Sequence, residues 1–228
     1  MTYFSSQDVT LGSIVKIPLR NKKILGLAVA KADVSNAKSD IKDMSFQLRK
    51  ILEIKENSIF KKEFIEAAIL LSIYFVSKKN IGVASLIPSL FREKYDEIAK
   101  FVNIPHEEET EPKNIKSEKL IFQTNLEDRL SYYKTLIRGQ FALRKSIFIV
   151  LPTEYDIEIF EKSLSKGVEK FVFSLHGGLK PKEILERYKQ IMYSAHGVLV
   201  ICTPQYLSIP LFNIEYIVIS IICISRIE

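Results

Sequence analysis

The chain has 228 residues, of which 47% are hydrophobic and 26% are charged, so it can bury a sizeable core in one or two domains. Cys202 and Cys223 both lie in apolar runs, which indicates reduced core thiols in a reducing compartment rather than a disulfide. The N-terminus, MTYFSSQDVT, lacks a signal-peptide pattern, and the apolar stretch 214–224 is too short to span a bilayer. We therefore expect a cytoplasmic protein that makes no contact with a membrane.

The formal net charge of +6 is distributed unevenly along the chain. Residues 1–103 hold 17 Lys and Arg against 11 Asp and Glu, whereas the remaining residues hold 16 of each. A basic module beside a neutral one indicates a polyanion-binding surface on the first. Lysines that only keep the surface soluble would give the same count, so charge alone leaves both interpretations open.

Short strands are predicted in the first part of the chain. Residues 12–19 alternate apolar and polar side chains, residues 20–23 form a turn cluster, and residues 24–30 return as a second strand. A further strand is predicted across 48–54. Residues 60–76 then change to the apolar spacing of a helix.

A linker and an α/β layer are predicted in the rest of the chain. Residues 104–118 are acidic, bracketed by prolines and poor in apolar side chains, which predicts an extended linker. From residue 119 onward, helical and apolar segments alternate at the spacing of a parallel α/β layer. The predicted strands are 145–151, 170–175, 197–202 and 214–219, and the predicted helices are 126–141, 157–164 and 181–193.

Several segments together resemble a known family. Leu11–Leu19 (LGSIVKIPL) followed by Gly26, and then Ile81–Pro88 (IGVASLIP), resemble the N-terminal 3′-DNA-binding domain of the primosomal protein N′ (PriA) family. Three later segments are similar to motifs of that helicase's first motor lobe, which in the family read V-P-E, L-H-S-x-L and I-G-T-R-S. They are Val150–Thr153 (VLPT), Leu175–Leu179 (LHGGL) and Val200–Thr203 (VICT).

The resemblance implies an α/β chain in three parts. Residues 1–103 correspond to the small, β-rich 3′-DNA-binding domain, residues 104–118 to a linker, and residues 119–228 to a degenerate, truncated, RecA-like first helicase lobe. The implied partners are single-stranded 3′ DNA ends or forks and other replication-restart proteins. The family's winged-helix domain and second motor lobe have no counterpart. Separately, Met1 falls close to where the family's first strand is already under way and Ser220–Glu228 match nothing expected, which leaves open a fragment or a truncated gene product.

The motor motifs depart from the family pattern. A phosphate loop needs glycines and a lysine, but Thr124–Arg129 contains no glycine, and Asp128 stands at the lysine position beside Glu127. Lys134-Thr135 lies inside the predicted helix, and Ser220–Cys223 replaces the Mg²⁺-binding acidic box. The sequence therefore predicts DNA binding without ATP-driven unwinding, without a cofactor and without catalysis. The alternative is the front part of a working ATP-dependent 3′–5′ DNA helicase.

The resemblance also implies the residues of a DNA site. In the family, an aromatic residue, a glycine and a basic residue form a pocket for a 3′ end, and Tyr3, Gly26 and Arg49 stand at these places. Thr2 replaces the family's acidic neighbour of the aromatic residue. A ring that stacks on a base, a glycine that permits close approach and a guanidinium that binds phosphate suit this role.

Each site residue has a structural alternative. Tyr3 is also compatible with a frayed terminal aromatic, Gly26 with a packing glycine, and Arg49 with a surface residue paired to Glu53 or another acid. Arg20, Lys22 and Lys23 form a basic turn that either contacts the DNA backbone or is merely solvated.

The three histidines do not indicate a metal site. His106, His176 and His196 lack H-x-x-x-H spacing, and the cysteines lack C-x-x-C spacing. The pattern around His176 favours a turn between a strand and a helix.

Overall fold

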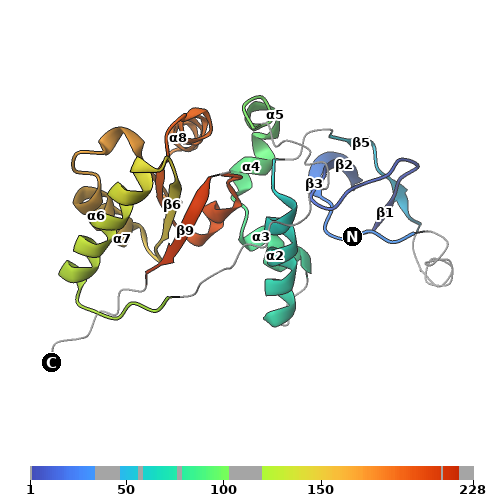
Figure 1. Cartoon of the computed structure of the whole chain (residues 1–228). Helices are drawn as coiled ribbons and strands as arrows, with labels where there is room; N and C mark the ends of the chain where they lie inside the picture. Colours follow the sequence, from blue (N-terminus) through green and yellow to red (C-terminus); the bar gives the residue numbers. More distant parts are fainter. Residues whose placement is uncertain are drawn as a thin grey trace. The chain divides into compact units, whose positions relative to one another are not determined.

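The computed structural model gives the chain two compact units, Met1–Ile104 (unit 1) and Pro105–Glu228 (unit 2) (Figure 1). The boundary between the units meets the predicted linker, 104–118, which lies outside the described residues. The structure describes residues 2–33, 47–55, 59–75, 79–102, 120–211 and 213–220.

Unit 1 contains a three-stranded sheet and a separate two-stranded ribbon. The sheet has the order β3-β2-β5 and is antiparallel, whereas the ribbon pairs β1 with β4 in parallel. The bounds are β1 (Tyr3–Phe4), β2 (Ile14–Leu19), β3 (Lys22–Leu27), β4 (Arg49–Lys50) and β5 (Glu53–Ile54). The hairpin predicted from residues 12–30 is therefore present as β2 and β3, but the second strand begins at Lys22, inside the predicted turn cluster, and ends at Leu27.

The fully buried apolar residues of this sheet all lie on its middle strand, β2. Ile14, Val15 and Ile17 are buried, as is usual for a strand that has a neighbour on both sides. Leu19 pairs with Lys22, so the hairpin turn consists of two residues, Arg20 and Asn21.

The strand predicted across residues 48–54 is split in two by a change of partner. Arg49 and Lys50 pair with β1, and the amide of Ile51 donates to the carbonyl oxygen of Phe4 at 2.9 Å. The next amide, that of Leu52, donates instead to Lys16 of β2, also at 2.9 Å. The stretch thereby ties the ribbon to the sheet.

Four helices complete the described part of unit 1. They are α2 (Lys62–Tyr74), α3 (Lys79–Ser85), α4 (Ser89–Glu93) and α5 (Tyr95–Ile98). Ile59, Phe60, Ile65, Phe91 and Ile98 are almost fully buried and form part of the core of this unit. The helix predicted across 60–76 is confirmed as α2, whereas α3, α4 and α5 were not predicted from the sequence.

Unit 2 contains a four-stranded sheet in which every described pairing is parallel. The strand order is β7-β8-β6-β9. The elements are α6 (Leu126–Ala142), β6 (Ser146–Val150), α7 (Glu154–Leu164), β7 (Val172–Leu175), α8 (Pro181–Tyr193), β8 (Leu199–Cys202) and β9 (Ile214–Ile219), with short 3-10 turns η1 (Glu169–Phe171) and η2 (Pro204–Ser208). This confirms the predicted parallel α/β layer.

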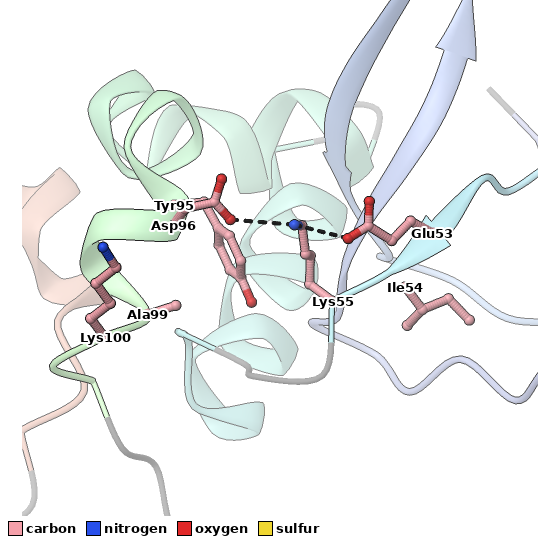
Figure 2. Close-up of a pocket in the computed structure, with 7 residues that line it drawn as sticks. All are labelled: Glu53, Ile54, Lys55, Tyr95, Asp96, Ala99 and Lys100. Carbon is pink, nitrogen blue, oxygen red and sulfur yellow. Dashed lines mark hydrogen bonds and ion pairs between the residues drawn. The ribbon is translucent and has the colours of Figure 1, made fainter.

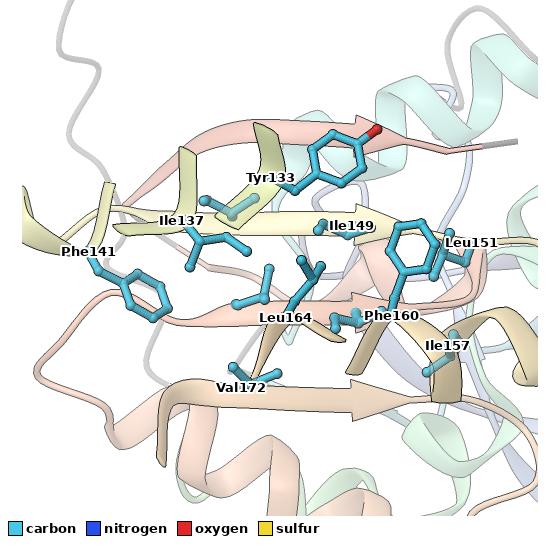
Figure 3. Packing of buried hydrophobic residues seen from close by; sticks show 12 residues of the cluster. Tyr133, Ile137, Phe141, Ile149, Leu151, Ile157, Phe160, Leu164 and Val172 are labelled. Carbon is cyan, nitrogen blue, oxygen red and sulfur yellow. The ribbon is translucent and has the colours of Figure 1, made fainter. Parts of the chain in front are cut away.

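Helices α6 and α7 cover one face of this sheet with a shared apolar cluster (Figure 3). Tyr133, Ile137 and Phe141 follow one another at i, i+4 spacing, which places all three on the same side of α6. All five residues of β6 are buried, so this strand is enclosed on both faces. A strand that is buried on both faces needs apolar side chains at successive positions, and this accounts for the continuous apolar run in its sequence.

No helix among the described residues is both long enough and apolar enough to cross a membrane.

Candidate nucleic-acid interface

The structure brings Tyr3 and Arg49 together. The two residues are register partners in the parallel β1–β4 ribbon, although they lie far apart in the sequence. Residues paired across neighbouring strands project to the same side, so the ring and the guanidinium share one face of the ribbon. Arg49 is exposed, whereas Tyr3 is partly buried.

The hydroxyl of Tyr3 reaches the turn end of the β2–β3 hairpin. Tyr3 Oη donates a hydrogen bond to the carbonyl oxygen of Pro18 at 3.1 Å. Pro18 pairs with Lys23, one step from the last pair of the hairpin. Tyr3 is therefore anchored in the structure, which argues against the alternative of a frayed terminal aromatic.

The three cations at the turn end of the hairpin, Arg20, Lys22 and Lys23, are all exposed. Arg20 has a φ of 51°, in the left-handed region that few bulky residues adopt. Lys22 and Lys23 are consecutive in β3, and successive strand residues project to opposite faces. The turn therefore presents lysines on both faces of the hairpin rather than on one.

Gly26 lies away from this end of the hairpin. It pairs with Val15, three residues along β2 from Pro18, or about 10 Å at the rise of a strand. A Cβ at this position would lie 3.3 Å from Cδ1 of Ile17. This close neighbour favours the packing interpretation of Gly26, and its role in a DNA pocket stays a prediction.

Glu53, the acid that the alternative interpretation assigned to Arg49, has other partners. Its carboxylate lies 2.9 Å from Nζ of Lys55 and 3.4 Å from Nζ of Lys16. The hydrogen bond from Lys55 holds the pKa of Glu53 below its usual value. Arg49 forms no ion pair with any described carboxylate, which leaves its guanidinium able to bind an external anion.

Lys50 extends the set of cations that the sequence indicated. It is exposed and is the register partner of Phe4, whose side chain is also exposed, on the other face of the ribbon from Arg49. Its position directly after Arg49 is the signal that could have identified it. We call Arg20, Lys22, Lys23, Arg49 and Lys50 the basic cluster. None of the five has an ion pair with a carboxylate in the described part of the chain.

A pocket of about 740 Å³ lies between β5 and α5 in the same unit (Figure 2). Lys55 Nζ lies between Glu53 and Asp96, 3.3 Å from the latter, and 5.9 Å from the centre of the Tyr95 ring. Hydrogen bonds to Glu53 and Asp96 raise the pKa of Lys55, and burial raises the pKa of Tyr95. Because two carboxylates neutralise Lys55, the pocket is less suited to an anion than the basic cluster.

The position expected for a phosphate loop in unit 2 is occupied by an ordinary capped helix start. The Asn125 side chain accepts a hydrogen bond from the amide of Asp128 at 2.9 Å. The Asp128 carboxylate accepts from Thr124 Oγ1 at 3.1 Å and from Asn125 Nδ2 at 2.9 Å. The first turn of α6 therefore presents two carboxylates, those of Glu127 and Asp128, where a phosphate would need cations and free amides.

In unit 2, two polar side chains, Glu154 and His176, lie close together after the carboxyl ends of β6 and β7. His176 follows β7, and its Nδ1 lies 3.5 Å from Oε2 of Glu154, at the start of α7. The Glu154 carboxylate occupies the space that a side chain at Gly178 would need. The predicted strand-to-helix turn at His176 is confirmed, because α8 begins at Pro181.

Metal ligands do not gather in the described residues, where no group of three or more His, Cys, Asp or Glu side chains could hold an ion. His196 stacks on Phe171, with ring centres 4.3 Å apart. His106 lies outside the described residues, as do residues 221–223 of the segment that replaces the acidic box.

Comparison with known proteins adds no family to these observations: no protein-family model and no curated protein matches the chain.

Proposed function

We propose that this chain is a DNA-binding protein of the primosomal protein N′ type, which recognises 3′ ends or branched DNA without ATP-driven unwinding. The proposal extends to a RecA-like origin for unit 2 and to contacts with other replication-restart proteins. A cytoplasmic location agrees with the free, buried thiol of Cys202, because thiols stay reduced in that compartment.

The Tyr3–Arg49 pair is the single observation that carries the proposal. An aromatic ring offers a stacking surface to a base, and a guanidinium beside it can bind a phosphate in a bidentate manner. The Pro18 carbonyl fixes the tyrosine. The other cations of the basic cluster lie on the same elements, Lys50 on the ribbon and Arg20, Lys22 and Lys23 at the turn end of the hairpin that Tyr3 contacts. This combination suits a nucleic-acid strand better than a small anion.

The first turn of α6 supports the part of the proposal that excludes ATP. A triphosphate at this helix start would face Glu127 and Asp128 and would compete with the side-chain cap of Asn125. Lys134 and Thr135 lie within α6, and Thr135 Oγ1 donates to the carbonyl of Ser131 at 3.2 Å. They belong to the helix and offer no loop of free amides.

Titration of the full chain with labelled single-stranded DNA tests the proposal. We expect fluorescence anisotropy to give tighter binding to a linear oligonucleotide with a free 3′ end than to a covalently closed circle of the same sequence. The affinity for both should fall as salt is raised, because bound phosphates release counterions. No binding to either DNA at low salt would refute the proposal, and equal binding to both would refute recognition of the 3′ end.

A further inference from the structure

The strand β9 contains neither lysine nor proline, two residues that normally protect an edge strand. β9 has the sequence IEYIVI and pairs with β6 on one side only, among the described residues. Its single charge, Glu215, is paired with Lys145 at 3.4 Å. Ile217 and Ile219 are 55% and 71% exposed. Edge strands are usually shielded by lysine, proline, a bulge or a covering segment. The pairing of β9 with β6 shifts register once, between Ser146 and Ile147, but the run from Tyr216 to Ile219 beyond the shift is regular, so this part of the edge calls for a partner.

An apolar segment of the same unit is also exposed. Leu120, Ile121 and Phe122 are 68%, 97% and 47% exposed, and the segment up to the cap residue Asn125 is neither helix nor strand. The Phe122 ring rests on Tyr132 of α6, with centres 4.7 Å apart. Helices α7 and α8 each follow a strand of the sheet directly, whereas α6 follows this exposed segment.

The handedness of parallel sheets determines where a strand before α6 would lie. Crossovers between parallel strands are right-handed in about 98% of cases. The crossover through α7 runs from β6 toward the β7 edge, and α7 shares its face of the sheet with α6 (Figure 3). A crossover through α6 on this face must run in the same direction, so it must enter β6 from the β9 side.

The crossover through α8 is consistent with this rule. It runs in the opposite direction, from β7 back to β8, and right-handedness then requires the other face. The buried α8 residues Ile184, Tyr188 and Ile191 indeed stand outside the α6–α7 cluster within residues 120–211. Since β9 already occupies the place beside β6, the position left for a strand before α6 is the outer edge of β9.

We infer that residues 120–124 dock onto the outer edge of β9 as a fifth parallel strand of this sheet. Docking covers both exposed apolar features at once and gives the unpaired edge amides and carbonyls of β9 partners. It also brings the acidic first turn of α6 to the carboxyl end of β9, beside Ser220. The inference rests on the topology of unit 2 and does not depend on the proposed function.

Cross-linking within the full chain tests the inference. Ile121→Cys and Ile217→Cys are combined in a Cys223→Ser background, where Cys202 is buried, and treated with a short bis-maleimide. A matched control combines Ile121→Cys with Phe173→Cys on β7, the opposite edge of the sheet. Thermal unfolding verifies that each variant is folded.

We expect an intramolecular cross-link in the 121–217 pair and none in the 121–173 pair. Cross-linking of the 121–173 pair, or of neither pair, would overturn the inference. A covalent dimer formed through position 217 would also overturn it, because a second copy would then occupy the edge. Hydrogen exchange gives an independent measurement: Ile121→Pro combined with Phe122→Pro should increase amide exchange in β9 about tenfold or more, and unchanged exchange contradicts docking.

Discussion

Tyr3 and Arg49 face the same side of the β1–β4 ribbon as register partners, and the tyrosine hydroxyl is held by the carbonyl of Pro18. The ring is therefore fixed beside a guanidinium that no described carboxylate neutralises. The ribbon joins the start of the chain to the strand region that follows the hairpin, so the pair exists only in the folded unit. This arrangement yields a specific expectation for each of the two side chains.

Arg49 should contribute a phosphate contact that carries no sequence information. We expect Arg49→Ala to weaken DNA binding about tenfold for all sequences alike, and to lower the salt slope by about one unit. Arg49→Lys should restore part of the affinity, because lysine keeps the charge but loses the bidentate geometry. Anisotropy titrations at several salt concentrations measure both quantities.

The control for this prediction is Arg92→Ala, which removes an exposed arginine of α4 in the same unit. It should leave the affinity and the salt slope unchanged. If Arg49→Ala behaves like Arg92→Ala, Arg49 is an ordinary surface residue and the Tyr3–Arg49 site must be abandoned.

Nucleotide binding should be absent at the start of α6. We expect no saturable heat when the full chain is titrated calorimetrically with Mg-ATP up to millimolar concentration, because Glu127 and Asp128 repel the triphosphate. Asn125→Ala should instead lower the free energy of unfolding by about 1 kcal/mol, the usual contribution of a helix cap. Saturable ATP binding in the micromolar range would disprove the prediction that the start of α6 binds no nucleotide.

Acid should weaken the ion pairs that Glu53 makes with Lys55 and Lys16. Its pKa is lowered by the hydrogen bond from Lys55, so the unfolded chain binds a proton more readily than the folded one. The resulting stabilisation is present above pH about 4.5 and is lost as the pH falls through the lower, folded-state pKa. Denaturant titrations at pH 6 and pH 3.5 measure this change.

The comparison for this prediction is between Glu53→Gln and Glu93→Gln, since Glu93 is an exposed acid at the end of α4. Glu53→Gln should lose less stability than the unchanged protein between the two pH values, because the group that titrates is gone. Glu93→Gln should follow the unchanged protein. Identical pH dependence in all three proteins would show that the ion pairs of Glu53 do not stabilise the fold.

The elements of unit 2 could largely be predicted because local features of the sequence mark them. β6 is buried at every position, and α8 begins at Pro181, a residue that favours the first turn of a helix. The apolar run of β6 and the proline of α8 therefore indicate these two elements without any knowledge of the tertiary contacts. The start of the strand predicted at 170–175 is instead the 3-10 turn η1, so the strand begins at Val172.

Unit 1 was less predictable because its contacts are set by pairing rather than by periodicity. No local signal shows that the stretch around Ile51 leaves β1 and joins β2 within two residues. The same change of partner places Arg49 beside Tyr3, so this register could not be derived from spacing. Helix α5, with four residues, is too short to show a helical period.

The most direct test of the central claim is where DNA binds on the full chain. Lys22→Ala, Lys23→Ala and Arg49→Ala are combined in one variant, and Arg138→Ala, Lys180→Ala and Lys182→Ala in a control that removes three exposed cations of unit 2. Anisotropy with a single-stranded oligonucleotide at a fixed low salt concentration compares both variants with the unchanged protein. The account predicts that the first variant loses at least about a hundredfold in affinity and the control less than about threefold. An equal or greater loss in the control would contradict the claim that the basic cluster of unit 1 is the DNA site.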